Sequence, residues 1–237
     1  MRRLVSFALL SLIFIAAGCG EPAPPPEPEN APPPPPTAQE LYQRLRQPLQ
    51  PIFDAKATDF NIPRSELPGL VQAFDSARQQ VAAEINAKEA MDRLKTDLSE
   101  VITWGKKEDK PKPALVAAKS FKLLEPGSTR YDAIIVWAEL FLERPNPNIK
   151  GYVREGDVQH VFVEVWDPVT NVTKNLTVRE GEEFFSRNPG DKPLLRVEKI
   201  VGEGNWVTFN YIPLNQTFDR ASPSELRRDP HGENRPS

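Results

Sequence analysis

Residues 158–166 read VQHVFVEVW, and this alternating stretch decides the class of the C-terminal fold. Successive side chains of a β-strand point to opposite faces of the sheet. Val161, Val163 and Val165 therefore fall on one face, and the residues between them fall on the other. The stretch predicts a strand whose valine face covers a core.

Similar runs flank this strand at short intervals, with turn residues between them. We expect strands in the ranges 131–143, 150–154, 173–178, 182–185, 194–201, 206–212 and 217–219, with a helix as the second option for 131–143. Gly202–Asn205 is a good hairpin connection. Strands at this spacing, without helices between them, predict a small antiparallel barrel or sandwich over residues 129–221.

The region before the strands, residues 37–105, has the pattern of amphipathic helices. Thr37 and Glu40 match a capping box, which predicts a helix start. Over residues 65–104, apolar side chains recur at steps of three and four, as on one face of a helix. This region predicts a long amphipathic helix or a helical hairpin, packed within the chain or paired with a second chain as a coiled coil. The fold class is therefore α+β.

Two polar segments are predicted to lie outside the folded elements. Residues 106–128 begin with a run of charged residues and prolines, which is typical of a linker. Residues 222–237 are polar and contain proline, which predicts a disordered tail.

The first residues have the parts of a bacterial export signal in order. Arg2 and Arg3 form a positive start, and Leu4–Ala17 is an apolar run. This run is shorter than the roughly 20 apolar residues that a membrane-spanning helix needs. We expect a signal peptide over residues 1–18.

The end of this signal, Ala16–Cys19, resembles the lipobox of bacterial lipoproteins. In that family the cysteine thiol takes a diacylglyceryl group, the signal is cleaved before it, and the new amine is acylated. The resemblance implies that Cys19 carries fatty-acyl chains such as palmitate and anchors the chain to a membrane. An ordinary signal peptide with a chance cysteine is the alternative. Cys19 is the only cysteine of the chain, so it has no disulfide partner within it.

A tether follows the predicted anchor over residues 19–36. Ten of the seventeen residues from 20 to 36 are proline, which lacks the N–H that helices and sheets require. We expect a polyproline II stalk of about 3.1 Å per residue. A ligand for a proline-binding module is the alternative.

Composition and motifs argue against two function classes. The net charge is −3 and becomes −5 without residues 1–18, which hold two arginines and no acid. A negative net charge argues against a protein that binds nucleic acids in general. We predict no enzyme, because no catalytic, cofactor-binding or metal-ligating motif is found. Glu180, Glu182 and Glu183 form a carboxylate cluster, which we interpret as part of a solvated turn.

Three tryptophans fall in predicted strands: Trp137, Trp166 and Trp206. We expect their rings in the core of the β-domain, and the alternative is that they stack on a carbohydrate.

Three segments carry a family resemblance. Val178–Phe184 (VREGEEF), Leu195–Ile200 (LRVEKI) and Trp206–Tyr211 (WVTFNY) look like the meander of the homology-region domain of type II secretion protein C. The whole layout resembles the PilP family, the inner-membrane lipoproteins of type IV pilus assembly. The resemblance implies a periplasmic clamp that binds partner proteins through strand edges.

These features together predict a non-enzymatic envelope lipoprotein that acts as a scaffold or assembly factor, of the type IV pilus or type II secretion kind. It would be anchored by lipid to the inner or outer membrane, face the periplasm, bind envelope proteins and need no cofactor. Self-association through the long helix is a further option. The alternative function is binding of a cell-wall polymer or other ligand through the β-domain.

Overall fold

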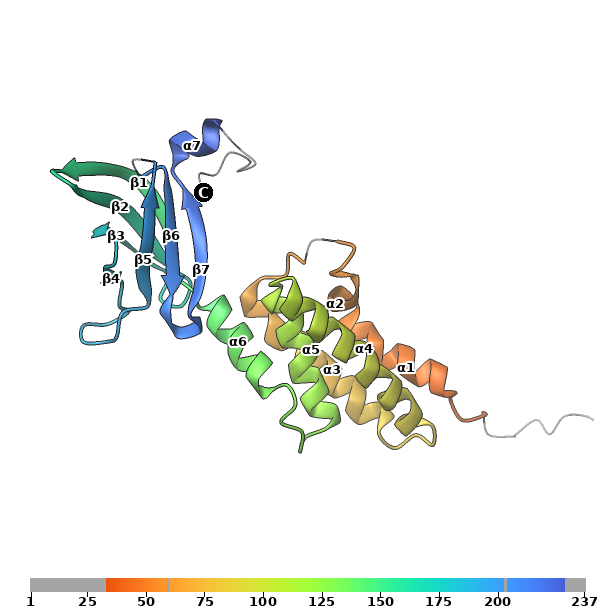
Figure 1. Cartoon of the computed structure of the whole chain (residues 1–237). Helices are drawn as coiled ribbons and strands as arrows, with labels where there is room; N and C mark the ends of the chain where they lie inside the picture. Colours follow the sequence, from red (N-terminus) through yellow and green to blue (C-terminus); the bar gives the residue numbers. More distant parts are fainter. Residues whose placement is uncertain (1–32, 59, 203, 229–237) are drawn as a thin grey trace, which may run out of the picture. The chain divides into compact units, whose positions relative to one another are not determined.

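The structure is a computed structural model that describes residues 33–58, 60–202 and 204–228 (Figure 1). The chain divides into a unit of residues 1–34 and a compact unit of residues 35–237. The predicted signal peptide, Cys19 and most of the tether lie outside the described residues. None of the described helices is long and apolar enough to cross a membrane.

The first half of the compact unit is helical, as the periodicity predicts. Its α-helices are α1 (Ala38–Arg46), α2 (Gln50–Asp54), α3 (Leu67–Val81), α4 (Ala87–Lys107), α5 (Pro111–Leu124) and α6 (Asp132–Leu142). The capping box is confirmed, because Thr37 Oγ1 accepts from Glu40 N at 3.2 Å and Glu40 Oε2 accepts from Thr37 N at 2.8 Å. The helices enclose a core of their own.

The apolar stripe over residues 65–104 lies on two helices. α3 ends at Val81 and α4 begins at Ala87, with Ile85 of the intervening turn 80% exposed. Both helices contact α1 and α5, and Phe74 and Leu94 are fully buried. The break lets each half of the stripe face the same compact core, which a single straight rod could not do. A second chain is not needed to cover it.

The prediction of a linker over residues 106–128 is wrong for its central part. α5 occupies Pro111–Leu124 and contacts α3, α4 and α6. Pro111 and Pro113 lie in its first turn, where the missing N–H has no partner in any case. The apolar residues after them are buried, so the prolines begin a central helix rather than interrupt one.

The prediction of a strand over residues 131–143 is also wrong. The segment forms α6, in which Trp137 and Ala138 are buried in the helical core and Leu140 packs against the core of the sheets. The run is apolar on nearly every side, so a period of two and a period of 3.6 fit it equally well. Packing against α5 selects the helix.

The β-strands follow the predicted meander closely. They are β1 (Asn146–Glu155), β2 (Val158–Asp167), β3 (Val172–Arg179), β4 (Glu183–Phe184), β5 (Leu195–Val201), β6 (Trp206–Tyr211) and β7 (Gln216–Ala221). They form two antiparallel sheets, of order β1-β2-β3 and β4-β5-β6-β7 (Figure 1). Gly156, at φ +62°, occupies the two-residue turn between β1 and β2.

One core joins the two sheets. Val161, Val163 and Val165 of β2 are buried, as their alternation predicts, together with Val197 and Phe209 of the other sheet. The prediction of a barrel or sandwich therefore resolves to two facing sheets that do not close into a barrel. Near one edge, Val197 exchanges backbone hydrogen bonds with the turn at 181–182.

The predicted disordered tail begins with a short helix. α7 spans Pro223–Arg228, and Ser222 accepts a hydrogen bond from Glu225 N at 3.3 Å. The rest of the tail lies outside the described residues.

Gly105 allows α4 and α5 to approach closely. A Cβ at this position would lie 2.9 Å from Ala114 Cβ and 3.1 Å from Lys110 O. We expect Gly105→Ala to lower the free energy of unfolding by about 1–3 kcal/mol, as overpacking does. Urea unfolding followed by circular dichroism measures this change.

Gly69 is the matched control for this variant. It also lies in a helix, but nothing is found within 4 Å of its Cβ position. Gly69→Ala should leave stability unchanged or raise it by up to about 1 kcal/mol, because alanine favours helix. Equal effects at both glycines would contradict the packing argument.

Candidate functional site

The three tryptophans expected in strands have different environments. Trp137 lies in α6 and is buried, so its predicted strand is wrong. Trp206 lies in β6, half-buried, with a buried Nε1 that has no hydrogen-bond partner among the described residues. Trp166, in β2, is 44% exposed, so it is the tryptophan of the sheets that best offers a ring face to a ligand.

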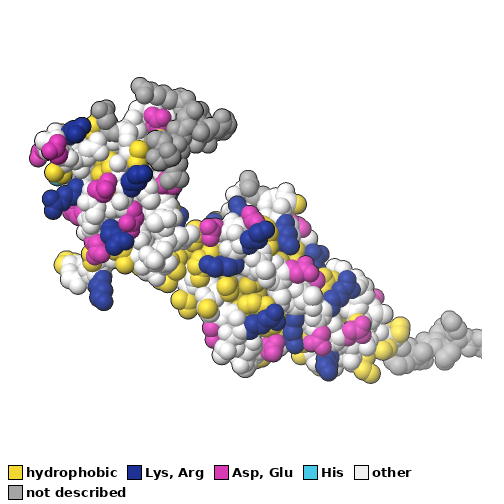
Figure 2. Space-filling model, in the orientation of Figure 1, with side chains coloured by type: hydrophobic (Ala, Val, Ile, Leu, Met, Phe, Trp, Pro, Cys, Tyr) yellow, Lys and Arg dark blue, Asp and Glu magenta, His cyan; other side chains and the backbone are white. Residues whose placement is uncertain are grey.

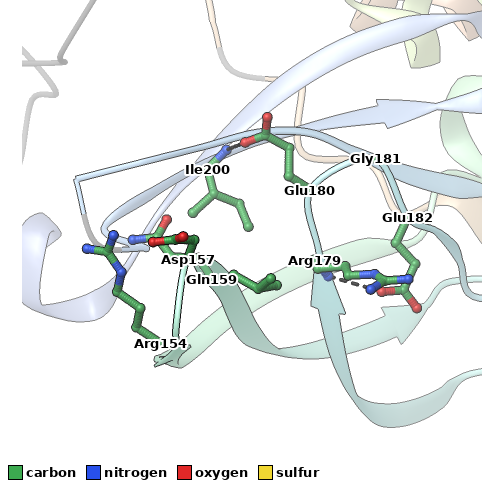
Figure 3. Close-up of a pocket in the computed structure, with 9 residues that line it drawn as sticks. Arg154, Asp157, Gln159, Arg179, Glu180, Gly181, Glu182 and Ile200 are labelled. Carbon is green, nitrogen blue, oxygen red and sulfur yellow. Dashed lines mark hydrogen bonds between the residues drawn. The ribbon is translucent and has the colours of Figure 1, made fainter.

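The carboxylate cluster contributes to a polar groove between two turns (Figure 3). Arg154 and Asp157 reach this groove from the β1–β2 turn, and Arg179, Glu180 and Glu182 from the β3–β4 turn. Glu180 Oε2 accepts from Ile200 N at 3.0 Å, and Glu182 Oε2 accepts from Arg179 N at 3.1 Å. These two carboxylates hold the turn together. The polar groove contains both cationic and anionic side chains, and its arrangement does not single out any of them as a catalytic group.

Within the described residues, no three His, Cys, Asp or Glu side chains are placed to hold a metal ion. His160 is half-buried in β2, and His231 lies outside the described residues.

A second groove, which we call the aromatic groove, lies where the helices meet the β2–β3 turn. It encloses about 660 Å³. Its lining is Ala55, Thr58, Phe60, Asn61, Arg64, Trp104, Lys110, Pro111, Lys112, Pro113, Phe141, Leu142, Arg144, Trp166 and Pro168. The groove thus draws on five separate stretches of the chain.

Aromatic rings and prolines supply the walls of the aromatic groove. Phe60, Trp104 and Phe141 are half-buried, and Trp166 is the most exposed of the four rings. Trp166 Nε1 donates to Asn171 Oδ1 at 3.2 Å, which orients the indole. Rings of this kind favour a ligand with flat or apolar faces.

The charged side chains that line the aromatic groove are all cationic. Lys112 donates to the carbonyl of Ile62 at 2.9 Å, and Arg64 forms an ion pair with Glu143 at 3.0 Å. The side chains of Lys110 and Arg144 make no ion pair with any residue that the structure describes. The site is therefore electropositive.

Arg144 is the most enclosed of these cations. Its Cζ lies 4.6 Å from the ring centre of Phe141 and 4.3 Å from that of Phe218. Burial, and repulsion from the nearby Arg220, lower the pKa of the Arg144 guanidinium, whereas Asp109 acts in the opposite direction. A desolvated guanidinium with no carboxylate in contact is well suited to bind an anion.

A buried ion pair fixes the end of β2 and the start of the β2–β3 turn, directly after Trp166. Asp167 is fully buried, and its Oδ2 lies 3.1 Å from Nε of Arg187. Thr170 Oγ1 also donates to Asp167, and Arg187 donates to the carbonyl of Glu143 at 2.6 Å. The pair therefore joins the β2–β3 turn to the end of α6.

The edge of β1, one of the strand edges of the kind that the family resemblance implies as binding sites, is poorly suited to strand addition. β1 carries Pro147 and a register shift between Ile149 and Gly151. Both features are typical of edges that resist pairing with another strand. The aromatic groove is therefore a stronger candidate site than this edge.

Sequence reasoning missed the aromatic groove as a site. It singled out Trp166 only as a core or stacking residue and assigned Lys110 and Lys112 to a linker. Residues this far apart in sequence leave no local spacing from which their meeting could be predicted.

The chain matches no protein-family model, no curated protein and no solved structure.

Proposed function

We propose that the chain is a non-enzymatic, lipid-anchored scaffold or assembly protein of the cell envelope that holds a partner protein in its aromatic groove. Cys19 would carry the anchor, and the proline-rich tether would hold the folded unit away from the membrane, in the periplasm. A type IV pilus or type II secretion machine is the kind of assembly to which the family resemblance points.

The observation that carries the proposal is the lining of the aromatic groove. Its aromatic rings stay partly exposed, and a fold without a partner would gain by covering them, while Lys110 and Arg144 have no ion-pair partner among the described residues. Interfaces between proteins are enriched in aromatic residues and arginine. By contrast, the carboxylates of the polar groove in Figure 3 are engaged in the fold itself.

Hydrophobic side chains also gather over the helical elements, with Lys and Arg among them (Figure 2). In α6, Val136 is 55% exposed although the helix is strongly apolar. A helix of this composition is normally buried. The exposed side chain of Val136 is therefore apolar surface that a partner would cover, outside the lining of the aromatic groove.

Photo-crosslinking in cells tests the proposal. A benzophenone amino acid in place of Asn61, an exposed groove residue, should give one specific adduct that mass spectrometry identifies as an envelope protein. The same probe in place of Lys88, exposed at the start of α4, is the matched control and should give none. No adduct from position 61, or the same adducts from both positions, would overturn the proposal.

Binding of a cell-wall polymer is the second candidate function. One observation favours it: Trp166 is exposed on the outer face of β2, where it pairs with Asn146 and Thr173 of the adjacent strands. A ring flanked by amide and hydroxyl groups suits a sugar. Quenching of tryptophan fluorescence by wall glycans, lost in Trp166→Ala, would favour this function over the scaffold.

A further inference from the structure

We infer that the ligand of the aromatic groove is an acidic, extended, proline-containing peptide segment of the partner protein. The inference rests on the proposed function and adds the chemistry of the partner to it.

Charge selects an anionic ligand. Among the described residues, Arg64, Lys110, Lys112 and Arg144 line the groove, and no Asp or Glu does. The chain as a whole has a net charge of −3, so a groove lined by four cationic side chains and no carboxylate differs from the average composition of the chain. Arg64 is already paired with Glu143, which leaves Lys110 and Arg144 as the cations most free to bind a carboxylate.

The walls select an extended ligand with apolar side chains. Phe60, Trp104 and Trp166 line the same groove as Pro111 and Pro168. Aromatic grooves bind polyproline II segments, which present preformed proline ridges and lose little entropy on binding.

The polar groove of Figure 3 does not share these properties. Its two arginines are matched by Asp157, Glu180 and Glu182, so the signs of charge nearly cancel. It also has no aromatic ring among its lining residues. An acidic proline-containing segment would therefore favour the aromatic groove.

Calorimetric titration of the full mature chain in detergent tests the inference. The probes are three synthetic peptides, (Pro-Pro-Glu)4, (Pro-Pro-Gln)4 and (Pro-Pro-Lys)4. The chain's own tether is also acidic and rich in proline. Its residues Glu21, Glu27 and Glu29 are therefore changed to glutamine, so that the peptide probe is the only acidic proline-rich segment present. We expect the glutamate peptide to bind, with an affinity that falls as salt rises, and the other two peptides to bind at least about tenfold more weakly.

Variants then assign the binding to the groove. Lys110→Gln and Arg144→Gln should each weaken binding of the glutamate peptide, and the double variant should weaken it by about tenfold or more. Lys110 is exposed and makes no side-chain hydrogen bond with a described residue, so its variant tests the groove without a risk to folding. Lys88→Gln is the control and should leave binding unchanged.

Four results would overturn the inference. Equal binding of the glutamine peptide would show that the negative charge of the peptide does not contribute to its affinity. Binding that survives the double variant would place the peptide elsewhere. Binding of an anionic polysaccharide such as polygalacturonate, but of no peptide, would assign the groove to a polymer. A crosslink from position 61 to a protein, together with no peptide binding, would leave the proposed function standing and remove only this inference.

Discussion

Replacement of Asp167 by alanine should lower the free energy of unfolding by about 3 kcal/mol, because it removes the nearer counter-ion of a largely buried guanidinium. Asp167 is fully buried and binds Arg187, Thr170 Oγ1 and the backbone N–H of Val169. The variant leaves the Arg187 guanidinium, which is only 19% exposed, with the longer ion pair to Glu143 at 3.7 Å as its remaining carboxylate contact. Chemical unfolding followed by circular dichroism measures the loss.

Glu164 of the same strand is the matched control. It forms an ion pair with Lys150 at 2.8 Å, but the side chains of Lys150 and Glu164 are 48% and 35% exposed. Glu164→Gln should therefore change stability by less than about 1 kcal/mol. A loss at Glu164 as large as that at Asp167 would contradict the idea that burial gives the pair at Asp167 its importance.

The stabilisation by Asp167 should depend on pH in one direction. Burial alone would raise the pKa of Asp167, but hydrogen bonds from Arg187, Thr170 and Val169 outweigh it and hold the pKa below its usual value. A lowered folded-state pKa stabilises the protein above the unfolded pKa, and this stabilisation is lost as the pH falls through the folded value. Wild-type stability should therefore fall more steeply than that of Asp167→Asn below about pH 4. Parallel curves for the two proteins would contradict this assignment.

Replacement of Cys19 by alanine should abolish the attachment of lipid and release the protein from the membrane. Each buried methylene of an acyl chain contributes about 0.8 kcal/mol, and more than one chain is needed for stable anchoring. Labelling with an alkyne analogue of palmitate, followed by carbonate extraction of membranes, measures both effects.

Gly20→Ala is the control for the Cys19 variant. It changes the next residue of the chain and keeps the thiol, so label and membrane attachment should remain. Label that persists in Cys19→Ala would show that the acyl chains are on another residue, and membrane attachment without label would show that another contact holds the chain.

The strands could be predicted because their signal is local. The alternating valines of β2 allow only one face to be buried, and turn residues such as Gly156 limit where the neighbouring strands begin. The capping box at Thr37 is local in the same way. In each case, neighbouring residues along the chain contain the whole pattern.

The wrong predictions concern segments whose local sequence pattern fits two conformations. α6 is apolar on most sides, so its period is ambiguous until Trp137 packs into the helical core. α5 begins with Pro111 and Pro113, which are compatible with a linker and with the first turn of a helix. Burial of the residues that follow, against α3 and α4, selects the helix.

The sequence by itself determined the strands from β2 onward, the start of α1 and the mixed class of the fold, because each depends on residues that are close along the chain; the anchor at Cys19 stays a prediction. Only the tertiary structure decided that Phe60, Lys110, Arg144 and Trp166 line one groove. Their meeting depends on the packing of α5 and on the buried pair of Asp167 and Arg187. Contacts over such separations arise from the burial of a shared core and have no periodicity that the chain alone would reveal.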